Sequence, residues 1–462
     1  MVSFWVYDVG FLILFAIFIT WFLYSRRENL KREGIMFLYR TQLGVRAINY
    51  VGTRFKKFLE KIKYLVIVVG FGLMISMLYM LGQVVYTYIS VPEITEIIKA
   101  PPIAPLIPYF PELFGLTSFF PPFYFTYFLI ALAIVAIVHE FSHGIYMKLF
   151  GVKIKSTGIV FLGPIFGAFV EEDKNSFVKK NKTNQMTILG AGTFANTITA
   201  LLFYGLLVGF FFLAFSPSGY IFNSYATSLI SNNSITSVGE EIVGENNYTI
   251  VFSGGEKYFL DDNLKKQFDE NYSIIVAYED TPAFQNQIIG VIIQIDDVKI
   301  KNQEDIRIFL ESKSPGEKIN LITLYDGKNK NYEIILSEHP LNKNKSYLGV
   351  GYAESQPSGI FQKIIYKFVN FKESSTYYSP VVDGNFVVFI YNLLWWVMII
   401  NILVALFNML PVGILDGGRF FYLAILGLTK SKKVSKIFYK VITILILSSF
   451  ILITLIWFLR II

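Results

Sequence analysis

The stretch PPFYFTYFLIALAIVAIVHEFSHGIYM, residues 121–147, decides what kind of protein this chain forms. No charged residue lies between Glu112 and His139, and an uncharged run of this length predicts a membrane-spanning helix. His139 and His143 are four positions apart, so on a helix they project from one face, where two imidazoles can hold one zinc ion. Glu140 would lie beside a metal-bound water, the usual place of a general base.

The composition of the whole chain also indicates a membrane protein. Of its 462 residues, 54% are hydrophobic, 17% are aromatic and only 16% are charged, which is too apolar for an ordinary soluble protein. The formal net charge of +7 is spread unevenly, which favours membrane orientation over nucleic-acid binding. The chain has no cysteine, so disulfides and thiolate metal sites are excluded.

Uncharged stretches predict about six membrane spans. They lie at about 9–24, 64–89, 121–147, 187–215, 385–410 and 441–459. Arg26 and Arg27 follow the first stretch without a small-residue cleavage site, so we expect an anchored span rather than a removed signal peptide.

The charges between the spans predict how the chain is oriented. The Lys-rich loops that we expect in the cytoplasm are 25–63, 148–186 and 419–440. The stretch 216–383 carries twenty-two Asp/Glu against fifteen Lys/Arg and is then expected outside the cell. The Pro-rich segment 89–120 is too interrupted for a long helix, and we expect an external loop at the membrane interface.

Four parts of the chain follow from these patterns. The first two spans and a basic loop lie in 1–110. The first part of a membrane core lies in 111–215, and its second part, with the last span, lies in 356–462. Residues 216–355 alternate strand-like runs, such as GVIIQI and KINLITLY, with turn signals, and Asn302 could cap a helix NQEDIRIFLE. We therefore expect an inserted α+β domain there, but predict no regular structure for 231–272, which lacks periodicity.

A catalytic zinc needs a third protein ligand and an open position for water. Asp416 in NMLPVGILDGGR ends a second long uncharged run. Pro411 and the pair Gly417–Gly418 are expected to break the helix and turn this carboxylate inward. The alternative is that Asp416 only caps the next helix. His339 is expected outside the membrane. Asn408 either packs between helices or donates to a developing oxyanion.

Three motifs together resemble the site-2 protease family of intramembrane zinc metalloproteases. They are HEFSH, the GAGTFAN stretch with Gly192 and Asn196, and NMLPVGILDGG, and they occur in the family's order between about 121 and 428. The resemblance implies zinc held by His139, His143 and Asp416, and water activated by Glu140. It also implies a transition-state role for Asn408 and a PDZ-like fold for the inserted domain, 216–355.

The expected protein is thus an α-helical polytopic membrane protein with an inserted extracytoplasmic PDZ-like α+β domain. We expect it in the plasma membrane, with transmembrane proteins as substrates, no nucleic-acid partner, and a site inside the bilayer nearer the cytoplasmic face. The stretch Gly158 to Asp173 is expected to form a re-entrant hairpin whose edge pairs with an unwound substrate, or else a loop folded back on the protein. Rival functions are a catalytically silent zinc-binding scaffold and a metal transporter or sensor.

Overall fold

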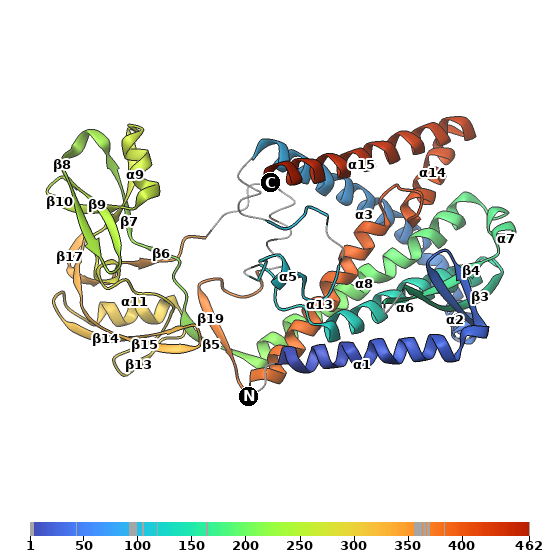
Figure 1. Cartoon of the computed structure of the whole chain (residues 1–462), viewed down its shortest axis with the longest axis horizontal. Coiled ribbons are helices and arrows are strands. Elements are labelled where there is room, and N and C mark those ends of the chain that lie inside the picture. Colours follow the sequence, from blue (N-terminus) through green and yellow to red (C-terminus); the bar gives the residue numbers. More distant parts are fainter. Residues whose placement is uncertain are drawn as a thin grey trace. The chain divides into compact units, whose positions relative to one another are not determined.

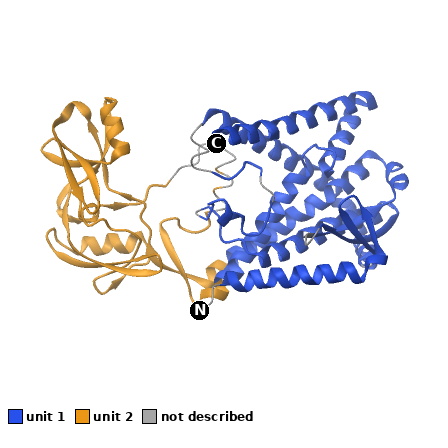
Figure 2. Ribbon diagram, viewed as in Figure 1, with its two compact units in different colours: residues 1–210, 388–462 blue, residues 211–387 orange. Residues whose placement is uncertain are grey.

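The computed structural model divides the chain into two compact units (Figure 2). One unit comprises Met1–Phe210 with Val388–Ile462, and the other comprises Phe211–Val387. The residues that the structure describes are 4–42, 44–91, 99–103, 106–117, 119–162, 165–354, 363, 366, 370–382 and 384–461.

Among the described residues, six helices are long and apolar enough to cross a membrane, as predicted (Figure 1). They are α1 (Phe4–Ser25), α3 (Lys56–Ser90), α6 (Phe125–Leu149), α8 (Lys182–Ala214), α13 (Gly384–Asn408) and α15 (Lys432–Ile461). Large apolar side chains such as Leu14, Ile75 and Leu206 are exposed on them, which suits contact with lipid tails. The chain is therefore a multi-pass membrane protein.

In their described residues, the Lys-rich loops of the first unit contain four strands, of which the sequence predicted only the hairpin at 158–173. Strands β1 (Leu30–Glu33) and β2 (Met36–Thr41) join β3 (Ile154–Leu162) and β4 (Ile165–Glu172) in one antiparallel sheet of that order. The expected hairpin at 158–173 is formed by β3 and β4, and its residues 163 and 164 lie outside the described residues. Among the described strands β4 pairs with β3 alone, so its other edge is open.

Shorter helices complete this unit. They are α2 (Val45–Arg54), α5 (Phe110–Leu113), α7 (Lys174–Val178) and α14 (Asp416–Thr429). The Pro-rich segment was predicted at 89–120, but α3 continues to Ser90; in the described part of what remains, α5 is the only helix, as the prolines predicted. Helix α6 packs against α1, α2, α3 and β4, so the helix with HEFSH lies among the other elements of the unit.

A buried carboxylate joins α1 to the start of α6. Asp8 accepts hydrogen bonds from the Tyr109 hydroxyl (2.6 Å), the Phe125 N–H (2.6 Å), and the Thr126 N–H (3.0 Å) and hydroxyl (2.5 Å). The first residues of α6 have no carbonyl partner within their own helix, so an anion from another helix supplies one. The sequence had placed Asp8 just before the first span, whereas α1 begins at Phe4 and includes it.

The second unit contains antiparallel sheets that pack around several apolar clusters. One antiparallel sheet has the order β15 (Lys328–Ile335), β14 (Lys318–Tyr325), β12 (Val291–Ile295), β5 (Phe215–Tyr220), β19 (Thr376–Pro380), with β13 (Val298–Lys299) beside β12. Helix α11 (Gln303–Glu311) starts where predicted, because the Asn302 side chain accepts the Asp305 N–H. The strands predicted from GVIIQI and KINLITLY are confirmed as β12 and β14.

A second sheet in this unit occupies the region for which no structure was predicted. Its order is β7 (Thr227–Ser231), β11 (Ile274–Glu279), β10 (Glu256–Leu260), β9 (Asn246–Ser253), β8 (Ile235–Val243). Two-residue turns at Gly244–Glu245 and Gly254–Gly255 join its hairpins, with positive φ at all three glycines. The prediction for 231–272 missed these strands because their turn glycines and polar outer faces resembled unstructured sequence.

The remaining elements of the second unit are short. They are α9 (Asp262–Asp269), α10 (Pro282–Gln285), and the strand pairs β16 (Ser337–His339) with β17 (Asn342–Tyr347) and β6 (Ser224–Tyr225) with β18 (Val350–Gly351).

Candidate metal centre

Helix α6 brings its two histidines together on a buried face. His139 and His143 are 7% and 6% exposed, and their Nε2 atoms are 3.0 Å apart. Their rings meet edge to face at a centroid distance of 4.7 Å. Since a spacing of four residues places side chains one turn apart, the HExxH pattern accounts for this pair directly.

Asp416 reaches the same point from the other end of the chain. Its Oδ2 atom is 3.2 Å from the Nε2 atoms of both His139 and His143. The helix break that the sequence predicted lies between the end of α13 and the start of α14, and it contains Pro411. Leu415 occupies the N-cap position and Asp416 is the first residue of α14, so its side chain meets the imidazoles rather than capping the helix.

The two glycines after Asp416 act differently from the prediction. Gly417 and Gly418 do not form the turn but lie in the first turn of α14. A Cβ atom on Gly417 would lie 2.3 Å from the Met409 carbonyl, and one on Gly418 would lie 2.3 Å from the Val412 carbonyl. Glycine therefore lets the start of α14 pack directly on the backbone that follows α13, and this packing sets the position of Asp416.

The hydrogen-bond partners show that the three atoms could hold a cation between them. The Nδ1 atom of His143 is 2.6 Å from the Ile188 carbonyl, which only accepts, so this nitrogen carries a proton, and in the neutral imidazole Nε2 presents a lone pair. That lone pair faces the His139 nitrogen and the Asp416 carboxylate. Tetrahedral zinc places its ligand atoms about 3.3 Å apart, close to the separations found here. The three residues fit a zinc ion with one position left open.

Helix α8 supports this cluster with three positions spaced four residues apart. The Ile188 carbonyl orients His143, and Gly192 leaves room for both rings, because a Cβ atom there would lie 2.5 Å from His143 Nε2 and 2.6 Å from His139 Cε1. The Asn196 Nδ2 atom is 3.1 Å from His139 Nδ1, and the Asn196 Oδ1 atom is buried without a partner among the described residues. The sequence marked Gly192 and Asn196 as part of a motif but assigned them no role.

Glu140 is one position along α6 from the first histidine but is not part of the three-residue cluster. Its Oε2 atom accepts the backbone N–H of Val170, on β4, at 2.9 Å. The residue is half-buried, so part of it stays accessible. A carboxylate beside a metal cluster, with one oxygen fixed, is suited to take a proton from water.

Two other residues weighed from the sequence lie differently. Asn408 is the last residue of α13 and is half-buried, and no hydrogen bond of its side chain is found among the described residues. His339 belongs to the second unit, on β16, where its Nδ1 atom accepts the Leu341 N–H at 3.1 Å.

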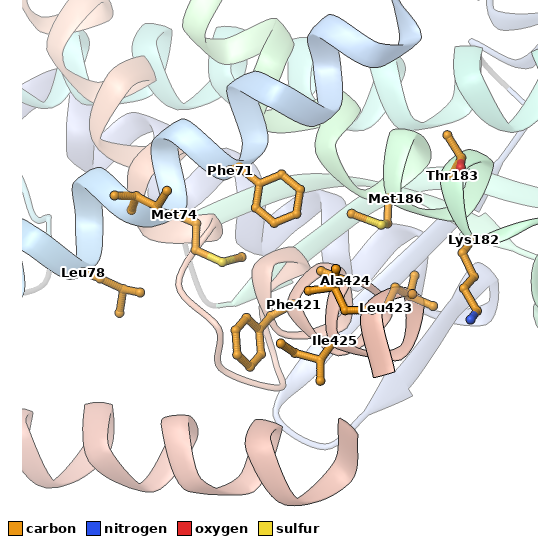
Figure 3. A pocket seen from close by; sticks show the side chains of 13 residues that line it. Phe71, Met74, Leu78, Lys182, Thr183, Met186, Phe421, Leu423, Ala424 and Ile425 are labelled. Atoms are coloured by element: carbon orange, nitrogen blue, oxygen red, sulfur yellow. The ribbon is translucent and has the colours of Figure 1, made fainter. Parts of the chain in front are cut away.

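An apolar groove of about 450 Å³ lies between α3, α8 and α14 (Figure 3). Its walls include Phe71, Met74, Met186 and Phe421, and the Lys182 ammonium at one end donates to the Leu426 carbonyl at 2.9 Å. Neither the three-residue cluster nor Glu140 lines this groove, so the groove is separate from the candidate metal centre.

Comparison with known proteins gives two matches. The sequence model of peptidase family M50 matches residues 127–449, a range that includes both halves of the cluster. The chain is also 26% identical, over 419 residues, to an uncharacterised protein of Methanocaldococcus jannaschii, and the match covers 89% of this chain and 84% of that protein.

Proposed function

The chain belongs to peptidase family M50, the family of the site-2 proteases, and on this premise we propose that it is an intramembrane zinc endopeptidase. Its substrates in this proposal are membrane proteins, cut within or next to a transmembrane segment. One observation carries the proposal. His139 and His143 of the apolar helix α6 meet Asp416 of α14, and Glu140 follows His139 on α6.

Each residue has a distinct role in the proposed reaction. His139, His143 and Asp416 hold the metal, which when bound polarises the scissile carbonyl and lowers the pKa of water. Glu140 takes the proton of the attacking water and passes it to the leaving amine. Asn408, at the end of α13, donates from its amide to the oxygen of the tetrahedral intermediate.

Substrate presentation requires an extended chain. A transmembrane helix satisfies its own peptide groups, so cutting it requires local unwinding and new partners for the freed groups. The open edge of β4 offers such partners by strand addition, next to the helix that carries Glu140. Helix-breaking residues near the cut should therefore speed cleavage, and an equal rate for a poly-Leu span would contradict the unwinding step.

We place the site inside the bilayer nearer the cytoplasm, because His139 lies nine residues, or roughly 13 Å of helix, before Lys148. The second unit is then extracytoplasmic, and we propose that it is PDZ-like and admits substrates whose outer domains are already trimmed. Deleting 220–355 should increase cleavage of full-length substrates. No increase would remove this filtering role.

The decisive experiment compares wild type with Glu140→Gln in detergent. Zinc content measured by mass spectrometry should be equal, whereas cleavage of a transmembrane peptide should be lost in the variant. Equal turnover by both proteins would contradict the role of Glu140. Absence of cleavage by the wild type, with zinc bound, would favour a silent scaffold, and zinc transport into vesicles would favour a transporter.

The absence of cysteine makes strand addition directly testable. Single cysteines at Ala168 on β4 and at Ile198 on the exposed face of α8 can be paired with cysteines placed along a substrate span. Disulfide formation should occur with the β4 position and not with the α8 position. Equal cross-linking of both would contradict pairing at this edge.

A further inference from the structure

The carboxylate of Glu140 is held by one backbone group of the neighbouring sheet. Its Oε2 atom accepts the Val170 N–H at 2.9 Å, and no other hydrogen bond of this carboxylate is found among the described residues. Val170 pairs with Thr157 on β3, but its N–H points away from β3 toward α6. The contact therefore uses the open edge of β4.

The direction of the Val170 N–H defines which groups form this edge. In an antiparallel pair, successive residues point their N–H groups alternately toward the partner strand and away from it. The register between β3 and β4 is unshifted from Thr157–Val170 to Leu162–Ile165. Ala168 and Phe166 thus also direct their N–H groups to the open edge, and Phe169 and Gly167 direct theirs to β3.

Strand β4 is fixed independently of Glu140. Glu172 accepts a hydrogen bond from Arg419 at 2.9 Å, and Arg419 lies on α14 three residues after Asp416. Glu171 pairs with Arg40 on β2 at 3.2 Å and accepts the Ser156 hydroxyl at 2.9 Å. The strand is therefore fastened to its own sheet and to the helix of the third cluster residue, and it can serve as a fixed support for a side chain on α6.

We propose that the backbone N–H of Val170 is the positioning group of the Glu140 base. It fixes Oε2 and leaves Oε1 to receive the proton of water, so that the strand which receives the substrate also sets the orientation of the base. A substrate strand then pairs at Ala168 and Phe166, while Val170 stays engaged with Glu140. This inference rests on the proposed function and specifies how its general base is held.

Two proline substitutions on β4 test it as a matched pair. Val170→Pro and Ala168→Pro each remove one N–H from the open edge, where proline is tolerated, but only the first removes the contact with Glu140. With full-length protein and a fluorogenic transmembrane peptide interrupted by Gly and Pro, Ala168→Pro should raise KM and leave kcat nearly unchanged. Val170→Pro should lower kcat roughly 10- to 100-fold, the usual loss for a supporting hydrogen bond.

A second measurement does not depend on activity. The infrared carboxylate band that disappears in Glu140→Gln should shift in Val170→Pro and stay in place in Ala168→Pro, at equal zinc content. If proline unfolds the strand, the corresponding backbone esters at 170 and 168 remove the same N–H groups without the ring. Equal kcat in both variants and an unshifted band would overturn the inference. A shifted band without any cleavage by the wild type would keep the contact and overturn the proposed function.

Discussion

Two carboxylates of the membrane unit, the buried Asp8 and the half-buried Asp416, meet α6 at different ends and have different kinds of partner. Asp8, at the start of the helix, is surrounded by four donors: the Tyr109 hydroxyl, the N–H groups of Phe125 and Thr126, and the Thr126 hydroxyl. Asp416, near the other end, faces two imidazole nitrogens and no hydroxyl or backbone N–H donor among the described residues. The carboxylate surrounded by donors holds two helices together, whereas the one facing two imidazole nitrogens could share a metal ion with them.

The physical basis of this difference is desolvation. A carboxylate removed from water is tolerated only when donors or a cation replace its hydration. At Asp8 the positive end of the α6 dipole adds to the hydrogen bonds. Burial, together with the Asp8 carboxylate, raises the pKa of Tyr109 well above its ordinary value, so this hydroxyl remains a donor. Asp416, the first residue of α14, also lies at the positive end of a helix dipole, but no backbone N–H or hydroxyl donor to it is found among the described residues.

The largest effect should separate the two aspartates by metal content. Asp416→Asn replaces a charged ligand by a neutral amide and should abolish both zinc retention and cleavage, because only two imidazoles remain. Asp8→Asn should retain zinc at the wild-type level. Mass spectrometry of the purified proteins measures both. Zinc loss in Asp8→Asn without unfolding would mean that Asp8 also contributes to zinc binding.

The next effect concerns the space that α8 leaves for the imidazoles. Gly192→Ala puts a Cβ atom 2.5 Å from His143 Nε2 and should weaken zinc binding at least about 100-fold, since ligands must keep a fixed geometry. Gly205→Ala on the same helix meets no atom within 4 Å and should be neutral or slightly stabilising, by up to about 1 kcal/mol. Competition with a zinc chelator gives the affinities. Equal affinities in the two variants would show that the rings can move away.

Asp8 should matter for stability rather than for metal. Asp8→Ala leaves two N–H groups and two hydroxyls without their acceptor, and should lower the free energy of unfolding by about 2–3 kcal/mol. Thr126→Val removes only one of the four donors and should cost about 1 kcal/mol or less. Thermal midpoints in detergent at matched lipid content report the difference. A midpoint for Asp8→Ala equal to wild type would show that water replaces the carboxylate.

Much of this arrangement could be predicted from the sequence because its signals are local. The HExxH spacing fixes two imidazoles on one helical face, and a carboxylate that ends a long uncharged run is costly enough to demand a reason. The six long helices found among the described residues could also be predicted, because each corresponds to one continuous apolar run. Asn302 was recognised as a cap because capping depends on the next three residues.

The contributions that were missed are long-range or belong to the backbone. Any residue at position 188 offers a carbonyl to His143, and any residue except proline at position 170 offers an N–H to Glu140, so neither leaves a mark in the side-chain pattern. Asp8 was taken as the boundary of a span because its four donors come from residues more than a hundred positions away. Gly192 acts through a missing atom, which only the packing reveals.

The smallest expected effect concerns Asn196, where an aspartate would place a third carboxylate beside His139. When His139 binds metal through Nε2, its Nδ1 atom carries a proton, so the Asn196 oxygen, now buried without a partner, is the group that should face it after a half-turn of the amide. Asn196→Ala should therefore weaken zinc binding roughly tenfold. Asn196→Asp places a carboxylate there. It accepts a hydrogen bond from the His139 Nδ1–H and lies near the zinc ion when zinc is bound.

Asn196→Asp should bind zinc at least as tightly as wild type, although the apo form of this variant should be less stable than that of Asn196→Ala, because its charge is buried without the metal. The pair is measured by chelator competition for affinity and by thermal midpoints with and without zinc. Affinity lost equally in both variants would show that Asn196 fills space and does not orient His139. Affinity kept only in Asn196→Asp would extend the rule drawn from Asp8 and Asp416, that the atoms facing a buried carboxylate decide what it does.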